Sequence, residues 1–238
     1  MKDDREGIKR LLKQIFLKDS INIEALTDFL IGQTGTGFIL RQYSDDPDPE
    51  EDEDYEEDEI LGLVSYVNLS DNSEKDFVKQ LSEYMLKYLQ KSARADMERL
   101  ITSESKKVWI INERFVNLPW KLALPSFEQM CKEISESNVN YDHYFLICKI
   151  MHPKTRFGPR NKQSRSEVLF LNPEEEVFDE FSKYSFEFNV SSQTDSDPRG
   201  GSWDEDDMQY APHRRVLVFD QTGWTKAIEK LKEVSKSN

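Results

Sequence analysis

The sequence predicts a layered α/β domain in which a mixed central sheet is flanked by helices on both faces. Three segments that are apolar at nearly every position, residues 144–150, 168–171 and 216–219, are typical of strands covered on both sides. Between them, apolar residues recur with helical spacing, so helices and covered strands alternate along the chain. No internal repeat or linker divides the 238 residues, which predicts a single domain over residues 1–238.

Two helices are expected at the start of the chain. The first has one apolar face, formed by Ile8, Leu11, Leu12, Ile15 and Phe16. Asn22 is a suitable N-cap for the second helix, because its side-chain oxygen can accept a hydrogen bond from a backbone N–H. The apolar face of this second helix holds Ile23, Leu26, Phe29 and Leu30. Gly35 and Gly37 are expected to end it, since glycine is favoured just after a helix.

Strands and helices are then expected to alternate. Residues 38–42 and 61–69 are predicted to be two strands of a hairpin with a long loop. The amphipathic segment that follows has apolar positions at Phe77, Leu81, Tyr84, Met85, Tyr88, Met97, Leu100 and Ile101. Residues 108–111 predict a short apolar strand, and the next helix carries Phe127, Met130, Cys131 and Ile134. Alternation predicts a half-buried strand at Phe186, Phe188 and Val190. A C-terminal helix is predicted from Trp224, Ala227, Ile228 and Leu231.

The loop of the predicted hairpin carries most of the net charge. Its acidic residues are Asp45, Asp46, Asp48, Glu50, Glu51, Asp52, Glu53, Asp54, Glu56, Glu57, Asp58 and Glu59. The formal net charge is −14, so the rest of the chain carries about −2. Carboxylates without nearby cations are costly to bury, which predicts a solvated, self-repelling insertion over residues 45–59. Two interpretations stay open, a solubilising insertion and a partner-binding segment that speeds association with a basic protein.

Composition argues against several classes of protein. Cys131 and Cys148 lie in apolar stretches, which favours reduced thiols in an intracellular protein over a disulfide framework. No apolar run is long enough to span a bilayer, and residues 1–5 have no apolar signal region, so neither membrane insertion nor secretion is expected. The acidic balance weighs against nucleic acid as a direct partner, and the self-repelling loop favours a monomer.

The sequence offers no strong catalytic, cofactor or metal motif. The glycine-rich segment 32–37 (GQTGTG) follows a helix and leads into a strand, whereas phosphate-binding loops usually lead from a strand into a helix. The acetyl-CoA motif of GCN5-related acetyltransferases has two residues between its Gln and its first Gly, but only one separates Gln33 from Gly35. The three histidines, His143, His152 and His213, lack the spacing of local zinc motifs. We therefore expect no catalytic residues, cofactor or metal, and expect Cys148 to be a small core residue.

Two further loops, residues 152–165 and 191–210, are expected to be mobile. The first contains no acid, and its basic residues are Lys154, Arg156, Arg160, Lys162 and Arg165. It is a candidate nuclear-import signal or a weak phosphate-contact patch, and a plain solvated loop is the third interpretation. The second is rich in Ser, Gly and Asp.

Residues 112–119 (NERFVNLP) interrupt apolar sequence with charge. They are predicted to form a loop between a buried strand and a helix. If buried, Glu113 and Arg114 would each need a partner. A paired, shape-holding loop is favoured over a binding hot spot.

This segment, together with residues 122–125 (LALP), resembles the hallmark of the BCCIP family. The hallmark positions here are Glu113, Arg114, Phe115, Asn117 and Pro119. Further similar segments occur in the same order over nearly the whole chain, at residues 7–14, 16–18, 26–28, 61–65, 68–69, 174–176 and 200–203, and in the terminal strand and helix. The loop at 152–165 departs from the family in holding fewer lysines than expected.

The resemblance implies a nuclear, shuttling protein that acts as a non-enzymatic chaperone or adaptor. It implies escort of a basic ribosomal protein, support of large-subunit ribosome biogenesis and a link to nuclear export. The alternative that it implies is a scaffold for DNA-repair and cell-cycle proteins of the BRCA-two and cyclin-dependent-kinase-inhibitor type. It also implies a fold resembling GCN5-related acetyltransferases without their cofactor site. A cryptic acyltransferase stays open as a third hypothesis.

Overall fold

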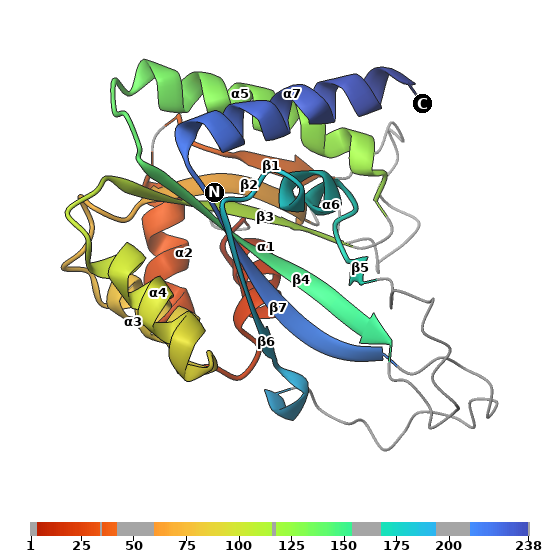
Figure 1. The fold of residues 1–238 in the computed structure, drawn as a ribbon. Coiled ribbons are helices and arrows are strands. Elements are labelled where there is room, and N and C mark those ends of the chain that lie inside the picture. Colours follow the sequence, from red (N-terminus) through yellow and green to blue (C-terminus); the bar gives the residue numbers. More distant parts are fainter. Residues whose placement is uncertain are drawn as a thin grey trace, which may run out of the picture.

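A central β-sheet organises the molecule (Figure 1). The computed structural model describes residues 4–33, 35–41, 60–115, 118–153, 168–193 and 210–237. In this described part, the sheet consists of β1 (Phe38–Arg41), β2 (Ile60–Asn68), β3 (Lys107–Arg114), β4 (His143–Pro153), β5 (Leu169–Phe170), β6 (Tyr184–Asn189) and β7 (Tyr210–Phe219). The strand order is β1-β2-β3-β4-β7-β6, and the short β5 pairs with β4.

The sheet is mixed and mostly antiparallel. Among the strands described, β3 and β4 run parallel, and the other paired strands run antiparallel. The helices are α1 (Asp4–Phe16), α2 (Ile23–Gly32), α3 (Asp76–Lys87), α4 (Lys91–Thr102), α5 (Ala123–Glu136), α6 (Glu174–Asp179) and α7 (Gln221–Ser237). The described residues also form two short 3-10 helices, η1 (Trp120–Leu122) and η2 (Ser191–Gln193).

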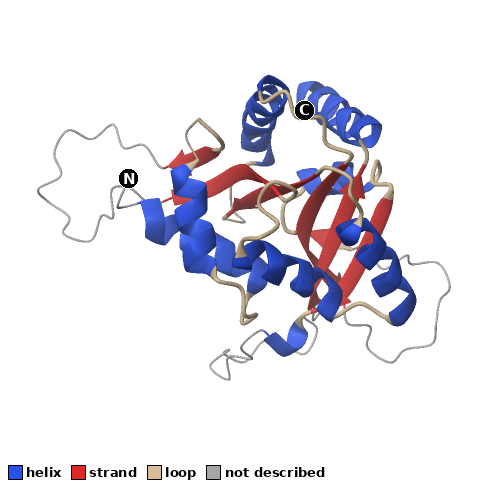
Figure 2. Ribbon diagram, turned by 90° about the vertical axis from the view of Figure 1, so that its left-hand side faces the viewer, coloured by secondary structure: helices blue, strands red, loops and turns tan. Residues whose placement is uncertain are grey.

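Helices cover both faces of this sheet, as the sequence predicted (Figures 1 and 2). Side chains of successive strand residues point to opposite faces. In β4, Phe145 and Ile147 therefore pack with α1–α4, whereas Tyr144 and Leu146 pack with α5, α6 and α7. β4 is buried from both sides, which is why it is apolar at nearly every position.

The N-terminal elements agree with their sequence signals. The Asn22 side chain accepts a hydrogen bond from the Ala25 backbone N–H at 3.0 Å, so it caps α2 as predicted. α2 already ends at Gly32, slightly before the predicted glycines. Gly35 and Gly37 instead have φ values of 70° and 87° and turn the chain into β1. β1 pairs with β2, which confirms the predicted hairpin.

The amphipathic segment after β2 forms two helices, α3 and α4. Two predictions need correction. Residues 168–171 are not a strand covered on both faces, because only Leu169 and Phe170 pair with β4 and Leu169 is 51% exposed. The bounds predicted for the two mobile loops, 152–165 and 191–210, are wrong at their described ends. His152 and Pro153 belong to β4, residues 191–193 form η2, and Tyr210 begins β7. Residues 154–167 and 194–209 lie outside the described part. None of the helices in the described residues is long and apolar enough to cross a membrane.

Close packing of α1 on β2 leads to a prediction. A Cβ added at Gly7 would lie 2.8 Å from the Cβ of Ile60, an atom that cannot move without the backbone. We expect Gly7→Ala to lower the free energy of unfolding by about 1–3 kcal/mol, although alanine is the better helix former by about 1 kcal/mol. Urea unfolding followed by circular dichroism measures the change. Gly32→Ala is the matched control, since no atom lies within 4 Å of its added Cβ. Equal stability of the two variants would contradict this packing argument.

Candidate functional site

The last three residues of β3 form the polar centre of the molecule. Asn112, Glu113 and Arg114 are only 3%, 1% and 5% exposed. They were predicted to lie in a loop, but they continue β3 because each pairs with a residue of β2 in regular antiparallel register. Buried charges need partners, so the neighbouring elements must supply them.

On the α5–α7 face, Arg114 binds Glu174 at the start of α6. Its two terminal nitrogens donate to the two carboxylate oxygens, with Nη2 2.5 Å from Oε2. Asn112 Nδ2 donates to Glu174 Oε1 and to Glu175 Oε1, both at 2.9 Å. These bonds hold the short helix α6 against the end of β3, 60 residues away in sequence. A fork-to-fork pair of this kind fixes orientation as well as distance.

Glu175 is fully enclosed beside this ion pair. Burial, followed by the charge of Glu174, raises the pKa of Glu175 to about 8. Glu175 Oε1 accepts hydrogen bonds from Asn112 and Asn172, each at 2.9 Å. A carboxyl group with this pKa is mostly protonated at neutral pH, so a second negative charge is avoided in the core. Cys148 lies nearby in β4, buried as predicted, and burial raises the pKa of its thiol well above the usual value.

On the α1–α4 face, the network continues toward α1. Lys149 Nζ donates to Glu113 Oε2 and, at 3.1 Å, to Gln14 Oε1. Arg214 donates to the backbone carbonyls of Ile15 at 2.8 Å and Gln14 at 2.6 Å. These carbonyls lie in the last turn of α1, where helix carbonyls lack partners within the helix. The end of β3 is therefore joined to α6 on one face and to α1 on the other.

A shallow apolar hollow opens directly beside this network. It lies between β1, the end of β3 and the start of α5, and is lined by Phe38, Leu40, Gly62, Leu63, Val64, Asn112, Glu113, Arg114, Leu122, Ala123 and Ser126. Leu122 is 40% exposed, which is unusual for a large apolar side chain in the described part of the chain. The Gly37 N–H, just before β1, donates to Glu133 Oε2 at 3.0 Å and ties β1 to α5. The hollow thus has a rigid floor and an exposed apolar rim.

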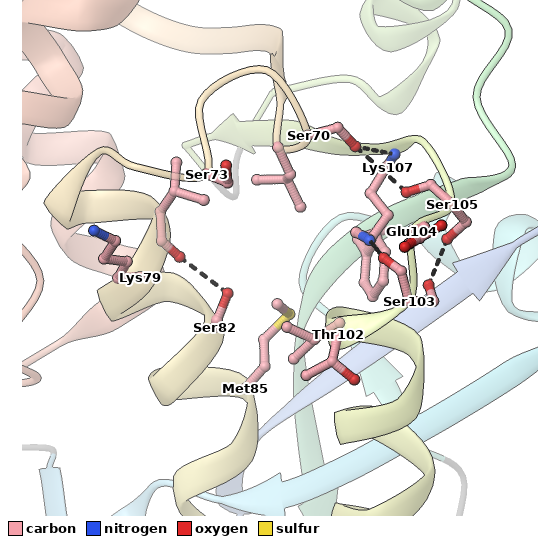
Figure 3. Close-up of a pocket in the computed structure, with 14 residues that line it drawn as sticks. Ser70, Ser73, Lys79, Ser82, Met85, Thr102, Ser103, Glu104, Ser105 and Lys107 are labelled. Carbon is pink, nitrogen blue, oxygen red and sulfur yellow. Dashed lines mark hydrogen bonds between the residues drawn. The ribbon is translucent and has the colours of Figure 1, made fainter.

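A second cavity, of about 520 Å³, lies between α3, α4 and β3 (Figure 3). Several of its hydroxyl groups form hydrogen bonds within the chain. Ser103 Oγ lies 2.6 Å from Ser105 Oγ, and Ser70 Oγ accepts from the Lys107 backbone N–H at 2.9 Å. Lys107 Nζ donates to the Ser103 carbonyl, and burial lowers the pKa of this lysine. These bonds stabilise the turn between α4 and β3, so we assign the cavity no reaction.

The structure places only some of the residues that the sequence singled out. Phe115 is half-buried, with the Arg10 guanidinium 5.2 Å from its ring centre, whereas Pro119 is exposed. Asn117, the twelve acidic residues of 45–59 and the five basic residues of 154–165 lie outside the described residues. Arg114 is paired with Glu174 and Glu113 with Lys149, while Glu113 Oε1 has no hydrogen-bond partner among the described residues. The sequence suggested neither Lys149 nor Glu174 as these partners, because pairing across 36 and 60 residues leaves no local pattern.

The ion pair between β3 and α6 should dominate the stability of this region. Arg114→Met leaves Glu174 buried without its cation, and we expect a loss of about 3–5 kcal/mol in the free energy of unfolding. Urea unfolding measures this loss. Arg99→Met is the control, since Arg99 is exposed in its pair with Asp96 and should contribute about 1 kcal/mol or less. A loss at Arg114 as small as that at Arg99 would contradict the assignment.

Glu175 predicts a pH dependence of stability. Its pKa is about 8 when folded and 4.5 for the unperturbed group, so the folded state holds a proton that the unfolded state releases between these values. Stability from this group is complete below about pH 4.5 and is lost as pH rises through 8. The Glu175→Gln variant keeps the Oε1 acceptor at this position and cannot titrate.

The variant should therefore gain stability relative to wild type, by a few kcal/mol at most, as pH rises from about 5 to 8. Unfolding curves across this range measure the gain. Glu176→Gln is the matched control, because Glu176 is an exposed carboxylate in the same helix. A difference between Glu175→Gln and wild type that does not change with pH would show that Glu175 is ionised in the fold.

Known proteins resemble this chain over most of its length. The BCCIP family model matches residues 1–178. The "BRCA2 and CDKN1A-interacting protein" of Bos taurus is 33% identical over 246 residues, covering 97% of this chain and 79% of that protein. The human protein of the same name is 32% identical over 249 residues, covering 97% and 77%. The crystal structure of BCP1 from Saccharomyces cerevisiae superposes with a TM-score of 0.60 at 18% identity, covering 98% of this chain and 84% of that one, which shows a shared fold. The chain belongs to the BCCIP family.

Proposed function

We propose that this protein is a non-enzymatic, nuclear chaperone or adaptor that escorts a basic ribosomal protein. The observation that carries the proposal is where the acidic segment joins the described fold, at the last strand in the sheet order. Residues 42–59 join Arg41 to Ile60, which are register partners at one end of the β1–β2 hairpin. The segment that carries the twelve acidic residues therefore begins and ends beside β1, the strand that also borders the apolar hollow.

The edge strand supplies a mode of binding. Of the strands that the structure describes, β1 ends the order and pairs with β2 alone. The backbone groups on its outer side can pair with an extended segment of a partner, and side-chain pockets then select the sequence. The hollow lined by Leu40 and Leu122 is such a pocket. We infer that an extended segment of the partner adds to β1 and places an apolar side chain there.

The acidic segment supplies the choice of partner. A charge of −12 within fifteen residues attracts a basic protein and raises its association rate. It also screens a surface that would otherwise bind ribosomal RNA, which is the task of a chaperone for a ribosomal protein. We extend this proposal to large-subunit ribosome biogenesis, nuclear export, shuttling between nucleus and cytoplasm, and a monomeric state. The five basic residues of 154–165 are the proposed import signal, and the domain resembles GCN5-related acetyltransferases in fold alone.

A scaffold for DNA-repair and cell-cycle proteins is the second candidate. It is favoured by the name of the vertebrate relatives, which describes interaction with BRCA2 and CDKN1A. A scaffold of this kind relies on the apolar hollow more than on charge. Binding of a short peptide that is insensitive to salt and is lost in Leu122→Asp would favour this candidate.

An acyltransferase is disfavoured by the glycine segment. The Gly37 N–H already donates to the Glu133 carboxylate, and that negative charge would repel the phosphates of acetyl-CoA. The glycines also lead out of α2 into β1, so the segment does not place free N–H groups at a helix start. Saturable binding of acetyl-CoA would contradict the non-enzymatic proposal.

The chaperone proposal predicts the behaviour of a charge-neutral segment. Replacing the twelve acids of 45–59 by Asn and Gln should weaken binding of basic large-subunit ribosomal proteins at least tenfold at low salt, because the exposed charges no longer attract them. Wild-type affinity should fall toward that of the variant as salt rises, since a Debye length of about 8 Å screens the segment at physiological ionic strength. Fluorescence anisotropy with a panel of labelled ribosomal proteins measures both effects.

A shuffled segment with the same composition is the control, and it should retain wild-type affinity. Full affinity and full solubilising activity in the neutral variant would refute the role of the charge.

A further inference from the structure

A second group of side chains lies across β4, β7 and β6, away from the β1 edge. His152 belongs to β4, His213 to the adjacent β7 and Glu187 to β6 on its other side. Their ligand-type atoms all lie within 4.8 Å of one another. We propose that these three residues bind a divalent transition-metal ion of the zinc class.

Sheet register brings the three residues together. His213 is the register partner of Ile150, two residues before His152, and Glu187 is the register partner of Arg215, two residues after His213. Residues two apart in a strand share a face, so all three side chains lie on the face covered by α5–α7. The imidazole rings of His152 and His213 are 4.4 Å apart between centres. The spacing in sequence gave no sign of this group, because it depends on the order of the strands.

His213 has the orientation of a metal-binding histidine. Its Nδ1 lies 3.1 Å from the carbonyl oxygen of Ala211, a contact in which Nδ1–H donates. This leaves the lone pair of Nε2 available, and such a bond to the second ring nitrogen is typical of metal-binding histidines. Nε2 lies 3.2 Å from the Asn189 side-chain amide, a contact that an ion would replace.

The imidazole ring of His152 faces the carboxylate of Glu187. Its Nε2 lies 2.7 Å from Glu187 Oε1, but the two groups are not aligned as a hydrogen bond, and this buried nitrogen has no other hydrogen-bond partner in the described residues. An ion at this position would bind both atoms at once. The side chains of His152 and Glu187 are 28% and 30% exposed, so the group lies near the surface of the described part of the chain.

The surrounding charges favour a cation. Arg215 binds Glu187 Oε2 at 2.8 Å and Asp179 at 2.5 Å, so two carboxylates face one guanidinium. Arg215 retains Asp179 if Glu187 turns toward an ion. Two imidazoles and one carboxylate suit Zn²⁺, Co²⁺, Ni²⁺ or Cu²⁺, whereas Mg²⁺ and Ca²⁺ prefer oxygen ligands. Ligand atoms on one tetrahedral zinc ion are roughly 3.3 Å apart, given bonds of about 2.0–2.1 Å, so small side-chain rotations complete the site.

Bound metal would join three strands at one end of the sheet. β4 ends at Pro153 and β7 begins at Tyr210, close in sequence to His152 and His213. The ion would therefore stabilise the fold in this region, and the fourth coordination position would be open to water or to a partner side chain.

The test is a titration of the full chain, purified without a polyhistidine tag and treated with a chelator. We expect Zn²⁺ to bind with one ion per chain by calorimetry and to raise the melting temperature, and Mg²⁺ to do neither. His152→Asn, His213→Asn and Glu187→Gln should each weaken Zn²⁺ binding at least tenfold. His143→Asn is the matched control, because His143 is the remaining histidine and lies at the opposite end of β4.

Circular dichroism of each variant shows whether it folds. Absorption of the Co²⁺-loaded protein adds a readout of the ligand set, which should change in His213→Asn and stay the same in His143→Asn. The proposal is overturned if Zn²⁺ shows no saturable binding, or if His143→Asn loses as much affinity as His152→Asn and His213→Asn.

Discussion

The buried ion pair between Arg114 and Glu174 is the constraint on which the rest of the structure depends. A guanidinium in the core requires a carboxylate within reach, and this requirement places α6 against the end of β3. Glu175 can share the same enclosed space only by keeping its proton, in line with its raised pKa. The pair between Glu113 and Lys149 applies the same constraint on the other face of the sheet. That pair joins β3 to β4, and α1 is attached to the same strands by the bonds of Lys149 and Arg214 to Gln14 and Ile15.

This internal charge pairing affects how the hollow beside β1 could bind a partner. We infer that the floor of the hollow beside β1 keeps its shape before a partner binds, because ion pairs and hydrogen bonds hold the end of β3 to its neighbours. Binding then costs little ordering of the domain itself, which favours recognition by a rigid edge. The net charge of the protein is concentrated in residues 45–59, which join the two strands of this edge hairpin. Charge would govern how fast and how selectively a partner arrives, and the hollow would govern which partner stays.

Local signals in the sequence were sufficient for most elements and insufficient for the sites. The apolar spacing of α1, the cap at Asn22 and the continuous apolar run of β4 each depend on neighbours in sequence, and each was predicted. The charged end of β3 was not, because Glu113 and Arg114 are tolerated in a strand only with partners that lie far along the chain. The group formed by His152, His213 and Glu187 could not be predicted from the sequence for a related reason. It forms only because β7 lies between β4 and β6 in the sheet.

Hydrogen–deuterium exchange on β1 tests the central claim most directly. The amides of residues 38–41 would be compared in the free protein and in its complex with a basic large-subunit ribosomal protein, with α7 as an internal reference. Addition of a partner strand to the edge predicts strong slowing of exchange in β1 on binding and no change in α7. Slowing confined to α7 or α5, with β1 exchanging as fast as in the free protein, would contradict the account and move the binding face to the helices.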